Sequence, residues 1–486
     1  MRTTSPHNNV IERTLRNSIL DGASHSAMLG LTRNYVVPFA LTLQATTAQI
    51  GLLASVPSLT MALSQMAAPA LVVRAGSRKR LILPAAFCHA AIWLPILLIP
   101  YLFASHQVWW LIGLLTLSAV AGSLGIPAWG SIMADLVPEG IRGKFFGSRG
   151  RICGIVVLIS FFVGGAVLQF CAGNAFIGFS IIFGGAALFR LASWYFLKRM
   201  HEPRPCSTAD EKVNLLGLLV NLKESNLGRF VIFASLMNLA TSLGSPFMAV
   251  YMLRDLGFDY LTFVAINSVT SVASLMSFTF WGRRADRAGN VRILRITALL
   301  IPLVPILWTI STRLYVLIPV QLLSGFAWSG FILSSSNFIY DAATPQTRTH
   351  FIAIYTMLTG LAISIGAVLG GLMAPILPDL FGNRLITLFL LSGVLRYFVA
   401  ATFLYNISEV RRVPVIRTVN LLFDGIASLH SRLGAAFAEI ESLLFTLPIG
   451  VTHRDSFSVS MVLRPATIDC YVTVRHTRIP PVLDDS

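Results

Sequence analysis

Two short stretches of this chain, more than 200 residues apart, follow one pattern. Residues 282–292 read GRRADRAGNVR, and residues 69–80 read PALVVRAGSRKR. Arg287 lies 213 positions after Arg74 (287 − 74). Each stretch stands between two long apolar runs, and the shared register indicates an internal duplication.

Other residue pairs recur at nearly the same spacing in the two parts of the chain. They are Gly76 and Gly289, Pro38-Phe39 and Pro246-Phe247, Asp135 and Asp341, Arg142 and Arg348, and Arg190 and Arg396. The sequence therefore predicts two equivalent halves.

The composition excludes a water-soluble protein of this size. Of the 486 residues, 55% are hydrophobic and 12% are charged, and the mean hydropathy is +0.73. A helix that crosses a bilayer needs about 20 mostly apolar residues. The long apolar runs lie near 19–42, 47–73, 81–104, 108–134, 152–172, 175–197, 230–253, 260–281, 293–311, 314–339, 350–376 and 384–407. We therefore expect an all-α integral membrane protein with twelve transmembrane helices in two pseudo-symmetric six-helix bundles.

The basic residues predict the orientation. The net charge is +16, but the Lys and Arg residues are dispersed in short loops rather than gathered on a soluble face, which excludes nucleic acid as a partner. One set of loops holds most of them, whereas the alternate loops offer only Arg254, Arg313 and Arg384. Because Lys and Arg stay on the cytoplasmic side, we expect a multi-pass protein of the cytoplasmic (inner) membrane with both termini in the cytoplasm.

These patterns divide the chain into five parts. They are a cytoplasmic N-terminal segment (1–18), a first six-helix half (19–199), a cytoplasmic linker (200–229), a second six-helix half (230–408) and a cytoplasmic tail (409–486). In the tail, apolar residues from Leu422 to Leu444 recur at three- and four-residue steps, which predicts an amphipathic helix. It would lie on the membrane surface or mediate self-association.

The pattern G-x-x-x-D-R-x-G followed by basic residues resembles the cytoplasmic loop signature of the major facilitator superfamily. The resemblance extends over roughly residues 18–408, and the runs DLVPEGIRGKFFGSRGR and SPFMAVYMLRDLG resemble bacterial members. It implies a transporter that moves a small solute by alternating access, and not an enzyme. We expect it to work as a monomer among membrane lipids, without cofactors.

The same resemblance implies a cytoplasmic gate. Asp286, at a helix end, can accept hydrogen bonds from a helix N-terminus or an arginine, and we expect Arg149 or Arg151 to be its partner. The first copy departs from the signature, because Val73 stands at the carboxylate position and Pro69 at the first glycine. The candidate gate residues are Gly282, Asp286, Arg287, Gly289, Arg74, Gly76, Arg149 and Arg151.

The substrate site is expected near the middle of the membrane, between the halves, where polar groups are costly. Arg33 falls near the middle of the first span, and a guanidinium there suits an anionic substrate such as a carboxylate or phosphate. His25 lies eight residues earlier, so we expect both on one helix face. The candidate binding residues are Arg33, Asn34, His25, Asn238, Thr241, Asn267, Trp328, Asn337 and Tyr355.

Other ionisable residues are expected to have structural roles. Arg190 and Arg396 recur in the last span of each half, and we expect them to reach lipid head groups or to brace a half. Only Asp21 falls within a predicted span, at its edge, so a midplane carboxylate relay is absent. Facilitated diffusion, exchange, or coupling through Asp21 or His25 remain open, and the fifth span lacks the glycine-proline pattern of many drug/proton antiporters.

Two other functions compete with transport. One is a transporter-like sensor or scaffold that acts through its tail, and the other is a multispan membrane enzyme. Short, nearly uncharged outer loops argue against the enzyme, and no Walker motif occurs. The five cysteines show no metal-ligand spacing, so we expect no metal site.

Overall fold

The computed structural model describes residues 6–137, 139–203, 224–343, 348–380, 382–411, 457–464 and 467–474. Eleven helices in this part of the chain are long and apolar enough to cross a membrane. They match eleven predicted spans, and the remaining span, the first, is divided into two helices. The helical membrane fold is thereby confirmed.

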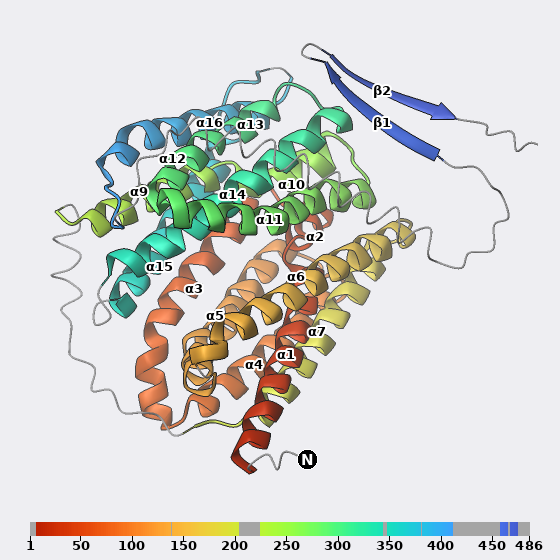
Figure 1. The fold of residues 1–486 in the computed structure, drawn as a ribbon. Coiled ribbons are helices and arrows are strands. Elements are labelled where there is room, and N and C mark those ends of the chain that lie inside the picture. The colour runs from red at the N-terminus through yellow and green to blue at the C-terminus, as the bar shows by residue number, and fades with distance from the viewer. Residues whose placement is uncertain are drawn as a thin grey trace, which may run out of the picture. The chain divides into compact units, whose positions relative to one another are not determined.

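The first half, red to yellow in Figure 1, is one bundle. Its helices are α1 (Pro6–Thr32), α2 (Val36–Thr42), α3 (Thr47–Ala75), α4 (Arg78–Leu102), α5 (Gln107–Leu136), α6 (Glu139–Phe170) and α7 (Ala175–Arg199). The second half, green to blue, is more interrupted. It contains α9 (Asn226–Ser242), η1 (Ser245–Phe247), α10 (Met248–Val250), η2 (Tyr251–Asp255), α11 (Tyr260–Ala288), α12 (Asn290–Leu300), α13 (Leu303–Leu307), α14 (Leu314–Ala342), α15 (Arg348–Met373), α16 (Arg384–Phe403) and η3 (Leu404–Asn406).

Both halves break their first helix at an equivalent place. Helix α1 ends at Thr32 and α9 ends at Ser242, each a few residues before a proline, Pro38 or Pro246. A proline has no N–H, and its ring clashes with the carbonyl four residues earlier, so a regular helix cannot continue through it without a kink or break. The two prolines are 208 positions apart (246 − 38), so the breaks belong to the repeat.

Two helices begin earlier than the apolar runs predict. Helix α1 begins at Pro6 rather than near residue 19, and α6 begins at Glu139 rather than near residue 152. Asp21 is consequently a mid-helix residue, and it is buried. The predicted position of Asp21 at the edge of the span is wrong. The apolar run marks only part of α1, because polar residues extend this helix toward the N-terminus.

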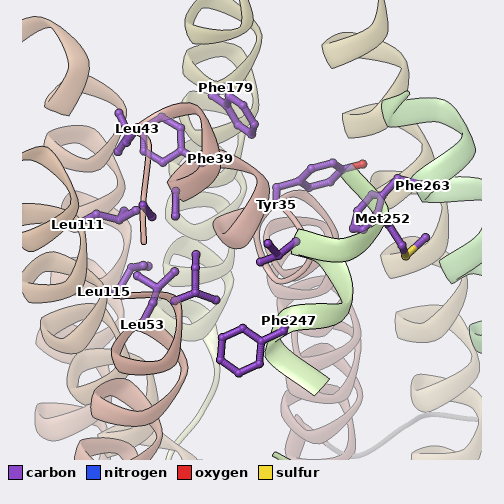
Figure 2. Packing of buried hydrophobic residues seen from close by; sticks show 14 of the residues in the cluster. Tyr35, Phe39, Leu43, Leu53, Leu111, Leu115, Phe179, Phe247, Met252 and Phe263 are labelled. Carbon is purple, nitrogen blue, oxygen red and sulfur yellow. The ribbon is translucent and has the colours of Figure 1, made fainter. Parts of the chain in front are cut away.

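The apolar cores differ between the two ends of the molecule. We call the end with most basic loops, where α3 ends and α4 begins, the basic end, and the other end the closed end. At the closed end one cluster joins both halves, and Figure 2 shows Tyr35 of the first half next to Met252 and Phe263 of the second. At the basic end each half has its own cluster, around Met133 in the first and Phe338 in the second.

Close backbone contact between α3 and α15 accompanies the shared cluster. A Cβ atom on Gly51 would lie 2.6 Å from the Ala367 carbonyl oxygen and 3.1 Å from the Gly371 Cα atom. Small residues permit such contact between membrane helices, where packing rather than water exclusion drives association. By contrast, none of the six ion pairs found among the described residues joins the first half to the second.

The chain from Val419 to Ser486 is a separate unit. Its described residues form an antiparallel hairpin of β1 (Phe457–Arg464) and β2 (Thr467–Val474), with Phe457 paired to Val474 and Arg464 to Thr467. The all-α description therefore applies to the membrane part only. The predicted tail helix at 422–444 and most of the linker lie outside the described residues, so those boundaries stay predictions.

Candidate functional site

A cavity of about 430 Å³ lies where the two helix breaks meet. Its lining comes mainly from the second half, with Arg33, Asn34 and Val157 contributed by the first. The second half contributes Thr241, Gly244, Ser245, Met248, Asn267, Thr270, Ser271, Ser274, Val304, Pro305, Trp308, Gln321, Ser324, Trp328, Phe389 and Arg396. We call this space the central cavity.

The broken helices explain how polar groups reach the cavity. Arg33 follows the last residue of α1, and Thr241 lies at the end of α9, 208 positions later (241 − 33). The duplicated breaks thus place equivalent positions of both halves at one site. Interrupted helices can expose backbone groups that a continuous helix would bond internally, and such interruptions are typical of binding sites in many membrane carriers.

Five of the nine predicted binding residues line the central cavity. They are Arg33, Asn34, Thr241, Asn267 and Trp328. Asn267 donates its side-chain N–H to the Phe263 carbonyl at 2.8 Å, which leaves its amide oxygen for a ligand. The hydroxyl of Thr270 is buried with no hydrogen-bond partner among the described residues. The site therefore has unused polar groups.

Four predicted binding residues do not line this cavity. Asn238 donates to the Ala234 carbonyl of its own helix, Tyr355 stacks on Phe230 with ring centroids 6.1 Å apart, and Asn337 is half-buried in α14. His25 lies inside the first half instead. Arg33 borders the central cavity, so the two residues that we expect on one helix face border different pockets.

The sequence also missed Arg396. This side chain lines the central cavity and is 5% exposed. Its Nε donates to Ser392 Oγ at 3.2 Å, and one terminal nitrogen donates to the Thr241 carbonyl at 3.4 Å. The predicted reach of Arg190 and Arg396 toward lipid head groups is wrong, because both side chains are buried inside the bundle.

A second group of ionisable side chains is buried within the first half. Arg190 contacts His25 Nδ1 at 3.0 Å and donates to Ser193 at 2.8 Å, and the Ser193 hydroxyl donates to Asp21 at 2.7 Å. Arg149 reaches the other oxygen of Asp21 at 3.6 Å. Asp21, His25, Arg149 and Arg190 border a pocket of about 200 Å³. Because Arg190 on α7 contacts His25 and is linked through Ser193 to Asp21, both on α1, it braces α1 against α7, in agreement with the alternative prediction for it.

The gate residues are arranged differently from the prediction. Asp286 is exposed and pairs with Arg411 at 3.6 Å, while Arg149 is held by Asp21 and by the Trp129 ring. The predicted contact between Asp286 and Arg149 is thus not formed in this conformation.

The other predicted gate residues differ in their exposure and backbone conformation. Arg74, Arg151 and Arg287 are exposed. Gly76 and Gly289 have positive φ angles of 66° and 89°, which explains glycine in both copies of the signature. Gly282 is half-buried in α11.

Ion pairs and hydrogen bonds of charged side chains stabilise the basic end of each half. Arg78 pairs with Asp135 at 2.6 Å, and Arg411 pairs with Asp341 at 2.8 Å. Burial alone would raise the pKa of Glu202, but hydrogen bonds from Ser77 and the N–H groups of Arg78 and Lys79, with the Arg78 charge, outweigh it and lower that pKa.

Comparison with known proteins agrees with this architecture. A family model described as Major Facilitator Superfamily matches residues 24–312 and 230–448. The alignment with a crystal structure of the nucleoside transporter NupG covers 82% of this chain and 99% of that one, with a TM-score of 0.63 and 15% identity. The alignment with a D-xylose-proton symporter structure covers 85% and 100%, with a TM-score of 0.63 and 14% identity.

Curated relatives match a shorter part of the chain. "Multidrug resistance protein MdtG" of Proteus mirabilis (strain HI4320) is 29% identical over 174 residues, which is 35% of this chain and 41% of that protein. The protein of the same name in Dickeya zeae (strain Ech586) is 30% identical over 187 residues, 38% of this chain and 44% of that protein. The chain thus aligns with about two fifths of the length of these relatives.

Proposed function

Because the chain belongs to the Major Facilitator Superfamily, we propose that it carries a small solute across a membrane by alternating access to the central cavity. The observation that carries the proposal is the pair of duplicated helix breaks, which bring Arg33 and Thr241 of the two halves to one cavity. Rocking of the halves would expose this cavity to each side in turn.

The arrangement of the cores supports such rocking. The halves share an apolar cluster only at the closed end, whereas they have separate clusters at the basic end. With basic loops in the cytoplasm of a bacterial inner membrane and both termini on that side, this conformation faces inward. The working unit is a monomer, since the cavity lies between two halves of one chain.

The substrate carries negative charge. Arg33 lines the cavity, and its guanidinium has no carboxylate within ion-pair distance among the described residues. No Asp or Glu occurs among the residues that line the central cavity in the described part of the chain. A carboxylate or phosphate on the solute would complement this charge.

Two asparagines provide a matched test of the site. Asn267 and Asn238 each donate to the carbonyl four residues earlier at 2.8 Å, but only Asn267 lines the cavity. In proteoliposomes screened for uptake of labelled anionic, neutral and cationic solutes, Asn267→Ala should reduce uptake about threefold to tenfold, and Asn238→Ala should not. Absence of uptake across the whole panel, or equal losses in both variants, would contradict the proposal.

Asp286 forms part of the cytoplasmic gate in this proposal. It leaves Arg411 and binds the start of α6 when the cytoplasmic side closes. Asp286→Asn would then weaken the closed gate and raise labelling of cavity cysteines from the cytoplasmic side. Asp379→Asn, which neutralises an exposed carboxylate after α15, is the control. Unchanged labelling in Asp286→Asn would remove this role.

A further inference from the structure

We propose that Arg396 is the main anion anchor of the central cavity and that the solute is an organic anion with a flat apolar body. This inference rests on the proposed function, because it names the substrate class of the same site. It assigns a binding role to a residue of the last helix, α16, for which the sequence pattern predicts a structural role.

The surroundings of Arg396 leave its charge uncompensated. Its contacts, Ser392 and the Thr241 carbonyl, are both uncharged, and no carboxylate lies within ion-pair distance of it among the described residues. Burying a cation without a counter-ion is costly. Because no acidic residue lines the central cavity in the described part of the chain, the counter-ion must arrive with the solute.

Arg190, the equivalent arginine of the first half, differs from Arg396 because a carboxylate lies near it. Arg190 lies 206 positions earlier (396 − 190) and is also buried, but Ser193 links it to the Asp21 carboxylate. The first half thus supplies a carboxylate near its arginine. In the second half the same place faces an open cavity.

The hydrogen-bonding capacity of Arg396 fits an oxyanion. A guanidinium has five N–H donors in a fixed fork, and the two bonds observed here leave the others for a ligand. A carboxylate or a phosphonate can accept two of them in parallel. The unpartnered hydroxyl of Thr270 borders the same space and can bind another oxygen of the ligand.

The remaining wall is aromatic and predicts the body of the solute. Trp308, Trp328 and Phe389 line the central cavity together with Val304 and Met248. Flat apolar groups pack well against such rings. A volume of about 430 Å³ is sufficient for a small organic molecule rather than an inorganic ion alone.

Quenching of tryptophan fluorescence in the purified full-length protein can test this assignment. Benzoate and phenylphosphonate supply the two oxyanions on one ring, and benzamide is the uncharged isostere of benzoate. We expect wild-type protein to bind at least one of the anions more tightly than benzamide. Arg396→Gln should weaken anion binding about tenfold to a hundredfold and leave benzamide binding unchanged.

Two further variants separate the anchor role from a structural one. Arg396→Lys keeps the charge with fewer donors and should restore part of the affinity. Arg384→Gln removes an exposed guanidinium from the first turn of the same helix and should leave binding unchanged. If neither anion binds the wild type better than benzamide, or if Arg396→Gln keeps full anion affinity, the inference is overturned.

A transport measurement shows whether only the anion-anchor role of Arg396 fails or whether the proposed transport function fails as well. Proteoliposomes that take up neutral or cationic solutes, and lose that uptake in Asn267→Ala, would support the transporter and reject the anion anchor. Uptake of benzoate or phenylphosphonate that depends on Arg396 would support both. Absence of uptake for every solute would reject the transporter itself.

Discussion

At the scale of single residues, one glutamate after the last helix of each half stabilises the basic end. Glu202 accepts hydrogen bonds from the N–H of Arg78 at 2.7 Å and from Ser77 at 2.6 Å, at the start of α4. Glu409, 207 positions later (409 − 202), accepts the N–H of Val291 at the start of α12. A carboxylate is favoured at a helix N-terminus by the helix dipole and by the unpaired N–H groups there.

Glu202→Gln should lower the free energy of unfolding by about 1.5 kcal/mol at pH 7, because charge-assisted hydrogen bonds are lost. The pKa of Glu202 is lower in the folded protein than its ordinary value of 4.5. Its charge therefore stabilises the fold above that value, and the stabilisation disappears as the pH falls through the lowered pKa.

Thermal unfolding in detergent across a pH series measures this effect. The difference between wild type and Glu202→Gln should be full at neutral pH and shrink below about pH 4. A difference that stays constant across the series would show that the charge of Glu202 is not responsible.

At the scale of elements, the interruptions of α1 and α9 matter more than the helices themselves. Each interruption precedes a proline of the repeat, and each supplies the cavity with a polar residue at its edge. In α4, by contrast, the helix continues through Pro84, Pro95 and Pro100. Proline alone thus does not determine a break, and neighbouring packing decides whether the helix ends or bends.

Pro246→Ala should reduce transport without lowering the thermal stability. Alanine favours a continuous helix by about 3 kcal/mol relative to proline, so α9 would extend past Ser242 and withdraw Ser245 from the cavity. Uptake in proteoliposomes and unfolding in detergent are the two measurements. Pro84→Ala is the control within an uninterrupted helix, and an equal loss of uptake in both variants would contradict this account.

At the scale of the whole molecule, the two ends differ in how the halves are joined. Apolar packing and the close approach of α3 to α15 join them at the closed end. At the basic end, ion pairs such as Arg78 with Asp135 stabilise each half by itself. Such a molecule can open at one end without disturbing the interior of either half.

Gly51→Val should prevent tight contact at the closed end and shift the population toward the outward-facing conformation. An added Cβ would lie only 2.6 Å from the Ala367 carbonyl oxygen. Labelling of a single cysteine at Ser271, which lines the cavity, by an impermeant maleimide outside intact cells should therefore increase.

Gly113→Val is the control for this experiment. Nothing lies within 4 Å of the position where its Cβ would be, so its labelling should match that of the wild type. Labelling of Gly51→Val that stays at the wild-type level would mean that this contact does not hold the closed end.

The sequence by itself determined the membrane fold and its duplication. The twelve apolar runs and the pairs of repeated residues are properties of local composition and spacing. They can therefore be recognised without any knowledge of the tertiary structure. Arg33, Asn34, Thr241 and Asn267, which line the central cavity, could be predicted as candidates because a polar side chain in an apolar span is costly and stands out. Trp328 is a candidate as part of an aromatic wall, and it also lines the cavity.

Only the tertiary structure decided which of these polar residues meet. In membrane helices apolar residues occupy every face, so periodicity does not reveal the face that borders a cavity. Arg190 and Arg396 occupy equivalent positions in the repeat, yet one is linked to Asp21 and the other faces the central cavity. His25 and Arg33 border different pockets. Which pocket each residue meets depends on the helices packed around α1, not on the spacing of the two residues.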